Sequence, residues 1–221
     1  MKLLTYNDVE ITVLRQTSNP AQIVQLACDI TQKQELTFGK SAPMRLIHFC
    51  MEADHQSVLE HAQITFLIRN VSRSFLAQIT RHRMASYTCS SQHYQDYRDY
   101  PMVVHPEYSA GVEDSLEETL NYYTELIDEH GILPQEARQV LPNACACTIL
   151  WTMNPVSLIN FFRKRMCKRN TDEMHTFAWK LHEICCSWYP ELFNLVGTYC
   201  QMDGACNQGK MSCGVPYPDD E

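Results

Sequence analysis

Residues 78–94, QITRHRMASYTCSSQHY, hold the densest group of side chains in this sequence that could do chemistry. The segment combines arginines, a histidine, several hydroxyl groups and aromatic rings. A guanidinium group binds phosphate through two parallel hydrogen bonds, and aromatic rings stack on planar bases. We therefore expect this segment to bind a phosphorylated aromatic ligand. The alternative is an exposed helix end, where basic side chains complement the helix dipole without binding a ligand.

The pattern of apolar residues before this segment predicts the elements that hold it. Residues 62–68 alternate between polar and apolar side chains and contain Thr, Phe and Ile, which favours a β-strand. Ser72 is typical of a helix N-cap, and the apolar stripe after it predicts a helix that ends near Arg81. The arginine-rich segment therefore begins where a short helix ends.

The rest of the chain is expected to be mainly helical. Residues 9–14 alternate as a half-buried strand would, and Asn19 is expected to cap a helix that begins at Pro20. No repeat or linker divides the chain, so we expect one helix-rich domain of the α/β or α+β class over residues 1–221. Further helices are expected over residues 42–51, 113–129, 134–142, 155–169 and 172–188.

Composition limits the classes of function. The 221 residues carry a formal net charge of −8, which argues against a partner that is a nucleic acid polymer. A small anion held by a few arginines remains compatible with that charge. No apolar run reaches the ~20 residues that a membrane span needs, and the N-terminal residues lack the apolar core of a signal peptide. We therefore expect no membrane partner and a cytoplasmic protein.

The eleven cysteines are interpreted as reduced thiols. Cys50, Cys145, Cys147 and Cys185 lie in apolar stretches, where a thiol packs as a small hydrophobic group. The last three cysteines, at positions 200, 206 and 213, are spaced too loosely to form paired zinc ligands. We expect them in a partly exposed tail over about residues 200–221, and we expect no metal site.

Four segments, in order along the chain, resemble the motifs of the flavin-dependent thymidylate synthases. They cover roughly residues 50–180, and such an ordered match is hard to obtain by chance. They are SVLEH at residues 57–61, RHR at residues 81–83 followed after seven residues by Ser91, EARQVLP at residues 136–142, and TMN at residues 152–154 with Asn160 and Arg165.

The resemblance implies a central, mostly antiparallel sheet and a homotetramer in which several subunits build each active site. It also implies two overlapping sets of site residues. Those expected to contact a pyrimidine nucleotide are Gln78, Arg81, Cys89, Ser90, Ser91, Gln92, His93, Arg138 and Arg165. Those expected to contact FAD are Ser57, Arg81, His82, Arg83, Met84, Cys89, Asn154 and Asn160.

The activity implied by the resemblance is the methylation of dUMP to dTMP. Methylenetetrahydrofolate is the implied carbon donor, FAD the cofactor and NADPH the reductant. Arg165 is the expected catalytic residue, because a guanidinium group facing a pyrimidine carbonyl would stabilise negative charge on the ring. Ser91 is expected to bind the substrate and not to attack it, because the sequence shows no base beside it. The other basic residues at positions 163–169 are interpreted as ordinary cations of a helix C-terminus.

The central motif departs from the family pattern. Thr88, Cys89 and His93 stand where that pattern has asparagine, glutamate and arginine, and Val156 stands where an arginine often contacts the flavin. The missing arginine would bind phosphate, so we expect a protonated His93 or the nearby Arg98 to replace it. Two alternatives stay open. One is methylation or hydroxymethylation of another pyrimidine nucleotide, such as dCMP or UMP, and the other is a homologue that binds nucleotide or flavin without turnover.

Overall fold

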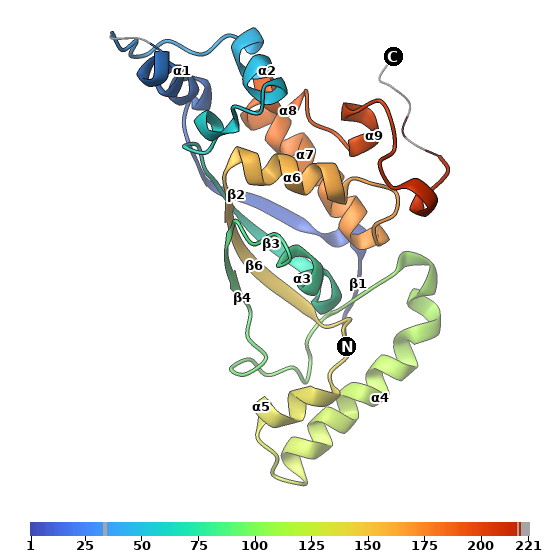
Figure 1. Cartoon of the computed structure of the whole chain (residues 1–221). Helices are drawn as coiled ribbons and strands as arrows, with labels where there is room; N and C mark the ends of the chain where they lie inside the picture. The colour runs from blue at the N-terminus through green and yellow to red at the C-terminus, as the bar shows by residue number, and fades with distance from the viewer. Residues whose placement is uncertain (33–34, 216, 218–221) are drawn as a thin grey trace. The chain divides into compact units, whose positions relative to one another are not determined.

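The computed structural model describes residues 1–32, 35–215 and 217, and it is helix-rich (Figure 1). The strands are β1 Leu3–Thr5, β2 Glu10–Gln16, β3 Ile64–Ser72, β4 Ser86–Cys89, β5 Met102–Val104 and β6 Ala146–Met153. The α-helices are α1 Pro20–Gln32, α2 Met44–Glu52, α3 Arg73–Ile79, α4 Ser109–Asp128, α5 Pro134–Ala137, α6 Pro155–Arg165, α7 Asp172–Trp188, α8 Pro190–Phe193 and α9 Tyr199–Met202. Within the described ranges, no helix combines the length and the apolar character needed to cross a membrane.

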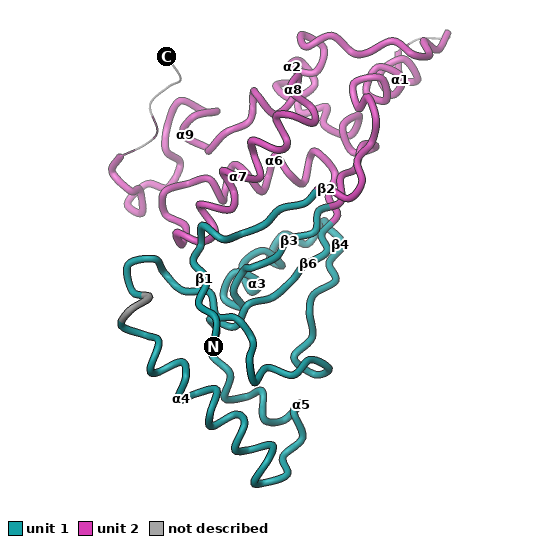
Figure 2. The backbone as a smooth tube through the Cα atoms, turned by 180° about the vertical axis from the view of Figure 1, so that it is seen from behind, with its two compact units in different colours: residues 1–12, 66–151 teal, residues 13–65, 152–221 magenta. Residues whose placement is uncertain are grey.

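The chain forms two compact units, drawn in teal and magenta in Figure 2. Unit 1 consists of residues 1–12 and 66–151, and unit 2 of residues 13–65 and 152–221. The chain passes from one unit to the other within β2, β3 and β6. Unit 1 contains α3, α4 and α5, whereas unit 2 contains α1, α2 and α6 to α9. The single domain expected from the sequence stays a prediction.

One sheet contains β2, β3, β6 and β4, in that order. The contacts between β3 and β6 show that the two strands run in opposite directions. The hydroxyl groups of Thr65 and Thr152 lie 2.9 Å apart at one end, and the amide of Arg73 donates to the carbonyl of Cys145, 3.0 Å away, at the other. The sheet is mostly antiparallel, so the expected α+β architecture is confirmed.

A second, smaller sheet pairs β1 with β5 in parallel, with Leu3 opposite Met102. It lies within unit 1 and packs near that unit's core, which includes the buried side chains of Tyr97, Tyr123 and Cys145. Antiparallel strands can be joined by a tight turn, whereas parallel ones need a long crossover. Here residues 6–101 lie between the two strands in sequence, so no local pattern predicts the pair.

The elements that carry the arginine-rich segment follow the sequence pattern. Ile64, Phe66 and Ile68 of β3 are fully buried, as the alternation predicts. Ser72 ends the strand and caps α3, because its Oγ accepts a hydrogen bond from the Phe75 amide at 2.9 Å. The predicted strand, cap and short helix before residue 80 are therefore confirmed.

Several other expectations need correction. Asn19 precedes α1 but does not cap it with its side chain; it adopts φ +49°, and its carbonyl accepts from the Gln22 amide. The helix expected over residues 155–169 ends at Arg165, and the one expected over residues 134–142 is a short α-helix followed by the 3-10 turn η4 Arg138–Val140. The strand β6 was not predicted, because its mostly apolar run, ACTILWTM, lacks a regular alternation.

The core of unit 2 is built from aromatic rings on α6, α7 and α8. Phe162 packs edge-on against Phe161, Phe193 and His182, with ring centroids 5.1–5.8 Å apart. Edge-to-face packing places the positive ring edge against a negative ring face. This packing fixes α6, the helix that carries Asn160 and Arg165.

All eleven cysteines are free thiols. Cys50, Cys145, Cys147 and Cys185 are buried, which confirms their interpretation as small hydrophobic groups. Burial raises the pKa of the Cys145 thiol to about 12, with the nearby Arg73 opposing the shift. Residues 200, 206 and 213 are partly or fully exposed, as expected for the tail.

Candidate active site

The RHR motif lies in the turn that leaves α3. Tyr87 of β4 ties this turn down, because its hydroxyl lies 2.7 Å from the Ile79 carbonyl and 2.8 Å from the His82 carbonyl. His82 is buried, whereas Arg81 and Arg83 on either side of it are exposed. Within the described ranges, neither arginine has an ion pair or a side-chain hydrogen bond. The turn is therefore fixed at its backbone while both guanidinium groups extend into solvent.

Met84 follows the motif, and its side chain is 78% exposed. An apolar side chain of this size gains free energy when a ligand or another subunit covers it. Gln78, one turn earlier on α3, is partly buried. The predicted residues of this segment thus lie together on a short stretch of unit 1.

The loop at residues 89–93 is anchored to β6. The Ser90 amide donates to the Thr148 carbonyl at 2.9 Å, and the Ser90 Oγ accepts from the Thr148 amide at 3.1 Å. Ser91 shapes the turn that follows, because its Oγ accepts from the His93 amide at 3.2 Å. The hydroxyl groups of Ser90 and Ser91 therefore hold backbone positions in this loop.

Cys89 and His93 occupy different surroundings. Cys89 is half-buried, and burial raises the pKa of its thiol, although the charge of Arg73 opposes the shift. Cys89 is therefore a neutral thiol at neutral pH, not an anion. His93 is exposed and packs edge-on against the ring of Tyr94, with centroids 4.4 Å apart.

A pocket of about 470 Å³ lies beside this loop, entirely within unit 1. Arg73 of α3 and Thr80, the residue just after α3, line the pocket together with Cys89 and Gln92 of the loop. Asn143, in the segment before β6, also lines it. Arg73 is half-buried here, and its Nη1 donates to the Ser90 carbonyl at 3.1 Å. The sequence alone did not single out Arg73, because a lone arginine at the start of a helix carries no motif signal.

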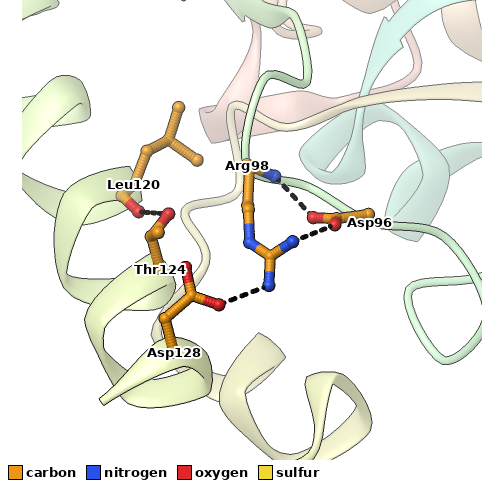
Figure 3. A network of polar contacts seen from close by, with 5 residues as sticks. All are labelled: Asp96, Arg98, Leu120, Thr124 and Asp128. Atoms are coloured by element: carbon orange, nitrogen blue, oxygen red, sulfur yellow. Dashed lines mark hydrogen bonds and ion pairs between the residues drawn. The ribbon is translucent and has the colours of Figure 1, made fainter.

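Arg98, one of the two expected replacements for the missing arginine, is already paired. Figure 3 shows its guanidinium group between two carboxylates: Nη1 lies 2.8 Å from Asp96, and Nη2 lies 2.8 Å from Asp128 of α4. Two carboxylates around one guanidinium group leave a net negative charge, which repels a phosphate. The ion pair with Asp128 thus fastens the segment around Arg98 to α4.

Arg138 is the first residue of η4 and is exposed. Pro134 begins the preceding helix, and the Leu141 amide closes the turn by donating to the Arg138 carbonyl at 3.1 Å. In the part of the chain that the structure describes, the guanidinium group has no acceptor. Arg138 is therefore presented like Arg81 and Arg83, with a fixed backbone and an extended side chain.

The predicted residues of unit 2 lie on η2 (Gln56–Leu59) and α6. Ser57 and Asn160 are exposed. Asn154 instead serves as the N-cap of α6, because its Oδ1 accepts from the Ser157 amide at 2.9 Å. Its side-chain carbonyl thus holds the helix, while the amide end remains able to donate to a ligand.

Arg165 lies at the C-terminus of α6 and is half-buried. Its Nη1 donates to the Oδ1 of Asn170 at 3.1 Å. The Nδ2 of Asn170 in turn donates to the carbonyls of Lys164 at 2.7 Å and Cys167 at 3.1 Å. Asn170 was missed by the sequence interpretation, and no local pattern marks an asparagine that joins a helix end to an arginine.

Three other cations, one on α6 and two just after it, do more than complement the helix dipole. Arg163 binds Asp203 at 2.7 Å and lies over the ring of Tyr199, and Arg169 donates to Gln208 at 2.7 Å. Lys168 donates to the carbonyl of residue 215 at 3.2 Å. These contacts fasten the C-terminal tail to α6 and its end, so the interpretation as unspecific cations was too general.

The described residues contain no group of three or more His, Cys, Asp or Glu side chains that could hold a metal ion. The predicted site residues instead form two sets. Unit 1 carries the RHR turn, the loop at residues 89–93 and Arg138, and unit 2 carries Ser57, Asn154, Asn160 and Arg165. The chemistry offered is that of cationic and neutral hydrogen-bond donors, which suits anionic, oxygen-rich ligands.

Comparison with solved structures supports the fold. The chain is similar to a UMP/dUMP methylase, PolB, from Streptomyces cacaoi bound with 5-Br dUMP, with a TM-score of 0.74 and 20% identity over 88% of this chain and 96% of that one. It is also similar to thymidylate synthase X from Helicobacter pylori with FAD and dUMP, with a TM-score of 0.72 and 23% identity over 84% and 97% of the two chains.

Comparison of sequences is more specific. The family model described as thymidylate synthase complementing protein matches residues 12–191. The flavin-dependent thymidylate synthase of Geobacter sulfurreducens is 34% identical over 93% of this chain and 94% of its own length. That of Clostridium tetani is 30% identical over 93% of each chain. A match of this length, together with the arrangement of the RHR turn and its loop, shows that the chain belongs to the flavin-dependent thymidylate synthase family.

Proposed function

We propose that this protein methylates the pyrimidine ring of dUMP to give dTMP, with FAD as its cofactor and methylenetetrahydrofolate as the carbon donor. The observation that carries the proposal is the RHR turn, whose backbone is fixed by Tyr87 while Arg81 and Arg83 extend into solvent. Such a turn offers two permanent cations to a phosphorylated ligand. Because its backbone is already ordered, little backbone conformational entropy is lost when the ligand binds. Family membership supports an enzyme of this class.

The residues present fit a flavin dinucleotide. FAD carries two phosphates and a ring system rimmed with carbonyl and nitrogen acceptors. Arg81 and Arg83 suit the phosphates, whereas the hydroxyl of Ser57 and the amide of Asn160 suit neutral acceptors. The exposed Met84 offers an apolar face. When bound, FAD supplies the redox chemistry that the polypeptide lacks.

Arg165 is proposed as the catalytic residue. Asn170 holds its guanidinium group through the 3.1 Å hydrogen bond, so the positive charge is oriented before a substrate arrives. A charge fixed in this way stabilises negative charge on a pyrimidine carbonyl without paying for reorganisation. Gln78, Arg81, Arg138 and the loop at residues 89–93 are proposed to bind and orient the nucleotide, and NADPH is proposed as the reductant.

A homotetramer with shared active sites is part of the proposal. The predicted site residues divide between the two units, and Met84 and Tyr94, which flank the motif, are 78% and 85% exposed. Exposed apolar side chains next to a binding motif support coverage by a ligand or a second subunit. We also propose a cytoplasmic location, supported by the eleven free thiols.

Incubation of the purified protein with FAD, NADPH and methylenetetrahydrofolate tests the activity against dUMP, UMP and dCMP. We expect a yellow protein that converts dUMP to a product with the mass of dTMP. Turnover of UMP or dCMP alone, or a hydroxymethylated product, would favour the alternatives that Cys89 and His93 raise. A protein that binds dUMP and FAD without turnover would be a binding homologue.

Mixing two inactive variants tests the shared site. Arg138→Ala removes a residue of unit 1 and Arg165→Ala a residue of unit 2. If one active site takes these residues from different subunits, mixed tetramers regain part of the activity because some sites receive both native residues. Light scattering of the wild type checks the expected tetramer mass, and a monomer would overturn this part of the proposal.

A further inference from the structure

We propose that Arg73 binds the phosphate of the nucleotide in the pocket beside the loop at residues 89–93, in place of the arginine that this chain lacks at position 93. The inference rests on the proposed function and names a residue that no motif of the chain contains. Arg73, Cys89 and Gln92 line the same pocket of about 470 Å³. Two of the three belong to the loop for which nucleotide contacts are proposed.

The backbone around Arg73 is fixed on both sides. Its own amide donates to the Cys145 carbonyl at 3.0 Å, and the next amide, of Ser74, donates to the Asn143 carbonyl at 3.2 Å. The guanidinium Nη1 reaches the Ser90 carbonyl at 3.1 Å. One of the five N–H donors of the guanidinium group is used in this way, and the others remain able to bind an anion.

Arg73 differs from Arg69 and Arg98 of the same unit in having no counter-ion among the described residues. Arg98 lies between Asp96 and Asp128, and Arg69 of β3 lies 3.6 Å from Glu10. A phosphate that approached either of those would have to displace a carboxylate. Arg73 requires no such exchange, because the one hydrogen bond that its guanidinium group makes within the described ranges is to a neutral carbonyl.

The charge of Arg73 also reaches its surroundings. Burial raises the pKa of Cys89, Tyr97 and Cys145, and in each case the positive charge of Arg73 works against that rise. Arg73 therefore lies close enough to these three groups to act on them, and Cys89 lines the same pocket. Since the thiols and the phenol stay neutral at neutral pH, they leave the charge of Arg73 uncompensated.

The two departures from the family pattern then have one explanation. A glutamate at position 89 would line the same pocket as Arg73 and would pair with it. The neutral thiol of Cys89 leaves Arg73 available, and His93 no longer needs to supply the permanent charge. The loss of a carboxylate at one position therefore compensates for the loss of an arginine at the other.

Titration calorimetry of the FAD-loaded full-length protein with dUMP and with deoxyuridine tests this inference. Arg73→Gln should weaken dUMP binding roughly 10- to 100-fold, the range expected for a lost charge-assisted hydrogen bond, and should leave deoxyuridine binding unchanged. Arg73→Lys should lose less, because it keeps the charge. Arg69→Gln, a change of the same type at an exposed arginine of the same unit, should lose nothing.

Cys89→Glu provides a test that keeps Arg73 in place. Restoring the carboxylate should weaken dUMP binding about 10-fold by pairing with Arg73, again without an effect on deoxyuridine. Equal dUMP binding by the wild type and Arg73→Gln, or tighter binding by Cys89→Glu, would overturn the inference while leaving the proposed function intact. A wild type that binds no dUMP would instead overturn the proposed function. If Arg73→Gln does not fold, as its melting curve would reveal, Arg73→Lys and Cys89→Glu decide.

Discussion

The arginines proposed for the site are held differently in the two units. In unit 1, Arg81, Arg83 and Arg138 lie on fixed backbone with exposed side chains. In unit 2, Asn154 is bonded to its own helix, and Arg165 is bonded to Asn170 just beyond it. An extended arginine loses up to ~2 kcal/mol of side-chain entropy when it binds, whereas an oriented one loses less. We therefore propose that the exposed arginines of unit 1 capture ligands, and that Arg165 of unit 2 places a charge for the chemical step.

Arg165→Ala tests the second half of this comparison and should have the largest effect. We expect kcat to fall about 100- to 1000-fold, the range seen when one preorganised donor is lost from a reacting centre. FAD should still bind, because unit 1 supplies the cations proposed for its phosphates. Single-turnover kinetics and flavin absorbance measure the two properties, and the exposed Lys164→Ala is the matched control. Unchanged turnover would remove Arg165 from the site.

Arg83→Ala tests the first half. The Kd for FAD should rise roughly 10-fold or more, since a charge-assisted hydrogen bond is lost. At saturating FAD, kcat should recover to near its wild-type value, because Arg83 is proposed to bind and not to act on the ring. Arg69→Ala, which removes an exposed arginine paired with Glu10, is the control. A kcat that stays low at saturation would break the division between capture and chemistry.

Asn170→Ala sharpens the comparison by removing the hydrogen bond to Asn170 that helps to orient Arg165. We expect kcat to fall by about 10-fold with little change in KM, since the charge of Arg165 is then oriented less precisely. Asn170→Asp keeps the acceptor for Arg165 and should recover part of the loss, although it cannot donate to Lys164 and Cys167. If both variants lose only thermal stability and keep kcat, Asn170 merely closes the helix.

The smallest expected effect is a pH dependence of unit 2. Burial lowers the pKa of His175, whose Nε2 accepts from Trp179 at 3.1 Å and lies 2.8 Å from the hydroxyl of Tyr217. The unfolded chain binds this proton more readily than the folded one. The contribution of neutral His175 to the stability of the fold is therefore fully present above the ordinary histidine pKa of ~6.5. It is lost as the pH falls through the lower pKa that His175 has in the folded chain.

Denaturant unfolding between pH 7.5 and 5 checks this sign. His175→Gln should flatten the slope below pH ~6.5, because it removes the titrating ring. His182 is a second contributor, since burial lowers its pKa too, and its Nε2 lies 3.0 Å from the Phe193 carbonyl. A wild-type stability that rises on acidification would contradict the assignment of both rings as neutral.

Local patterns were sufficient for much of the fold. Alternation predicted β3, a serine cap predicted the start of α3, and periodicity placed the long helix over residues 172–188 at the observed bounds. These signals are local, because cap bonds and helical periods join residues a few positions apart. The strands β4 and β5 and the parallel pairing with β1 escaped prediction, since their partners lie far away in sequence.

The sequence by itself determined the family, because the four ordered motifs and their spacing are properties of the chain alone. It also determined which residue types stand at the departures, Cys89 and His93. Only the tertiary structure decided that Arg98 pairs with Asp128 as well as with Asp96, and that Arg73 has no counter-ion among the described residues. Whether an arginine can bind an anion depends on which charged groups lie beside it in space. Contacts between segments that are distant in sequence leave no local pattern from which this could be predicted.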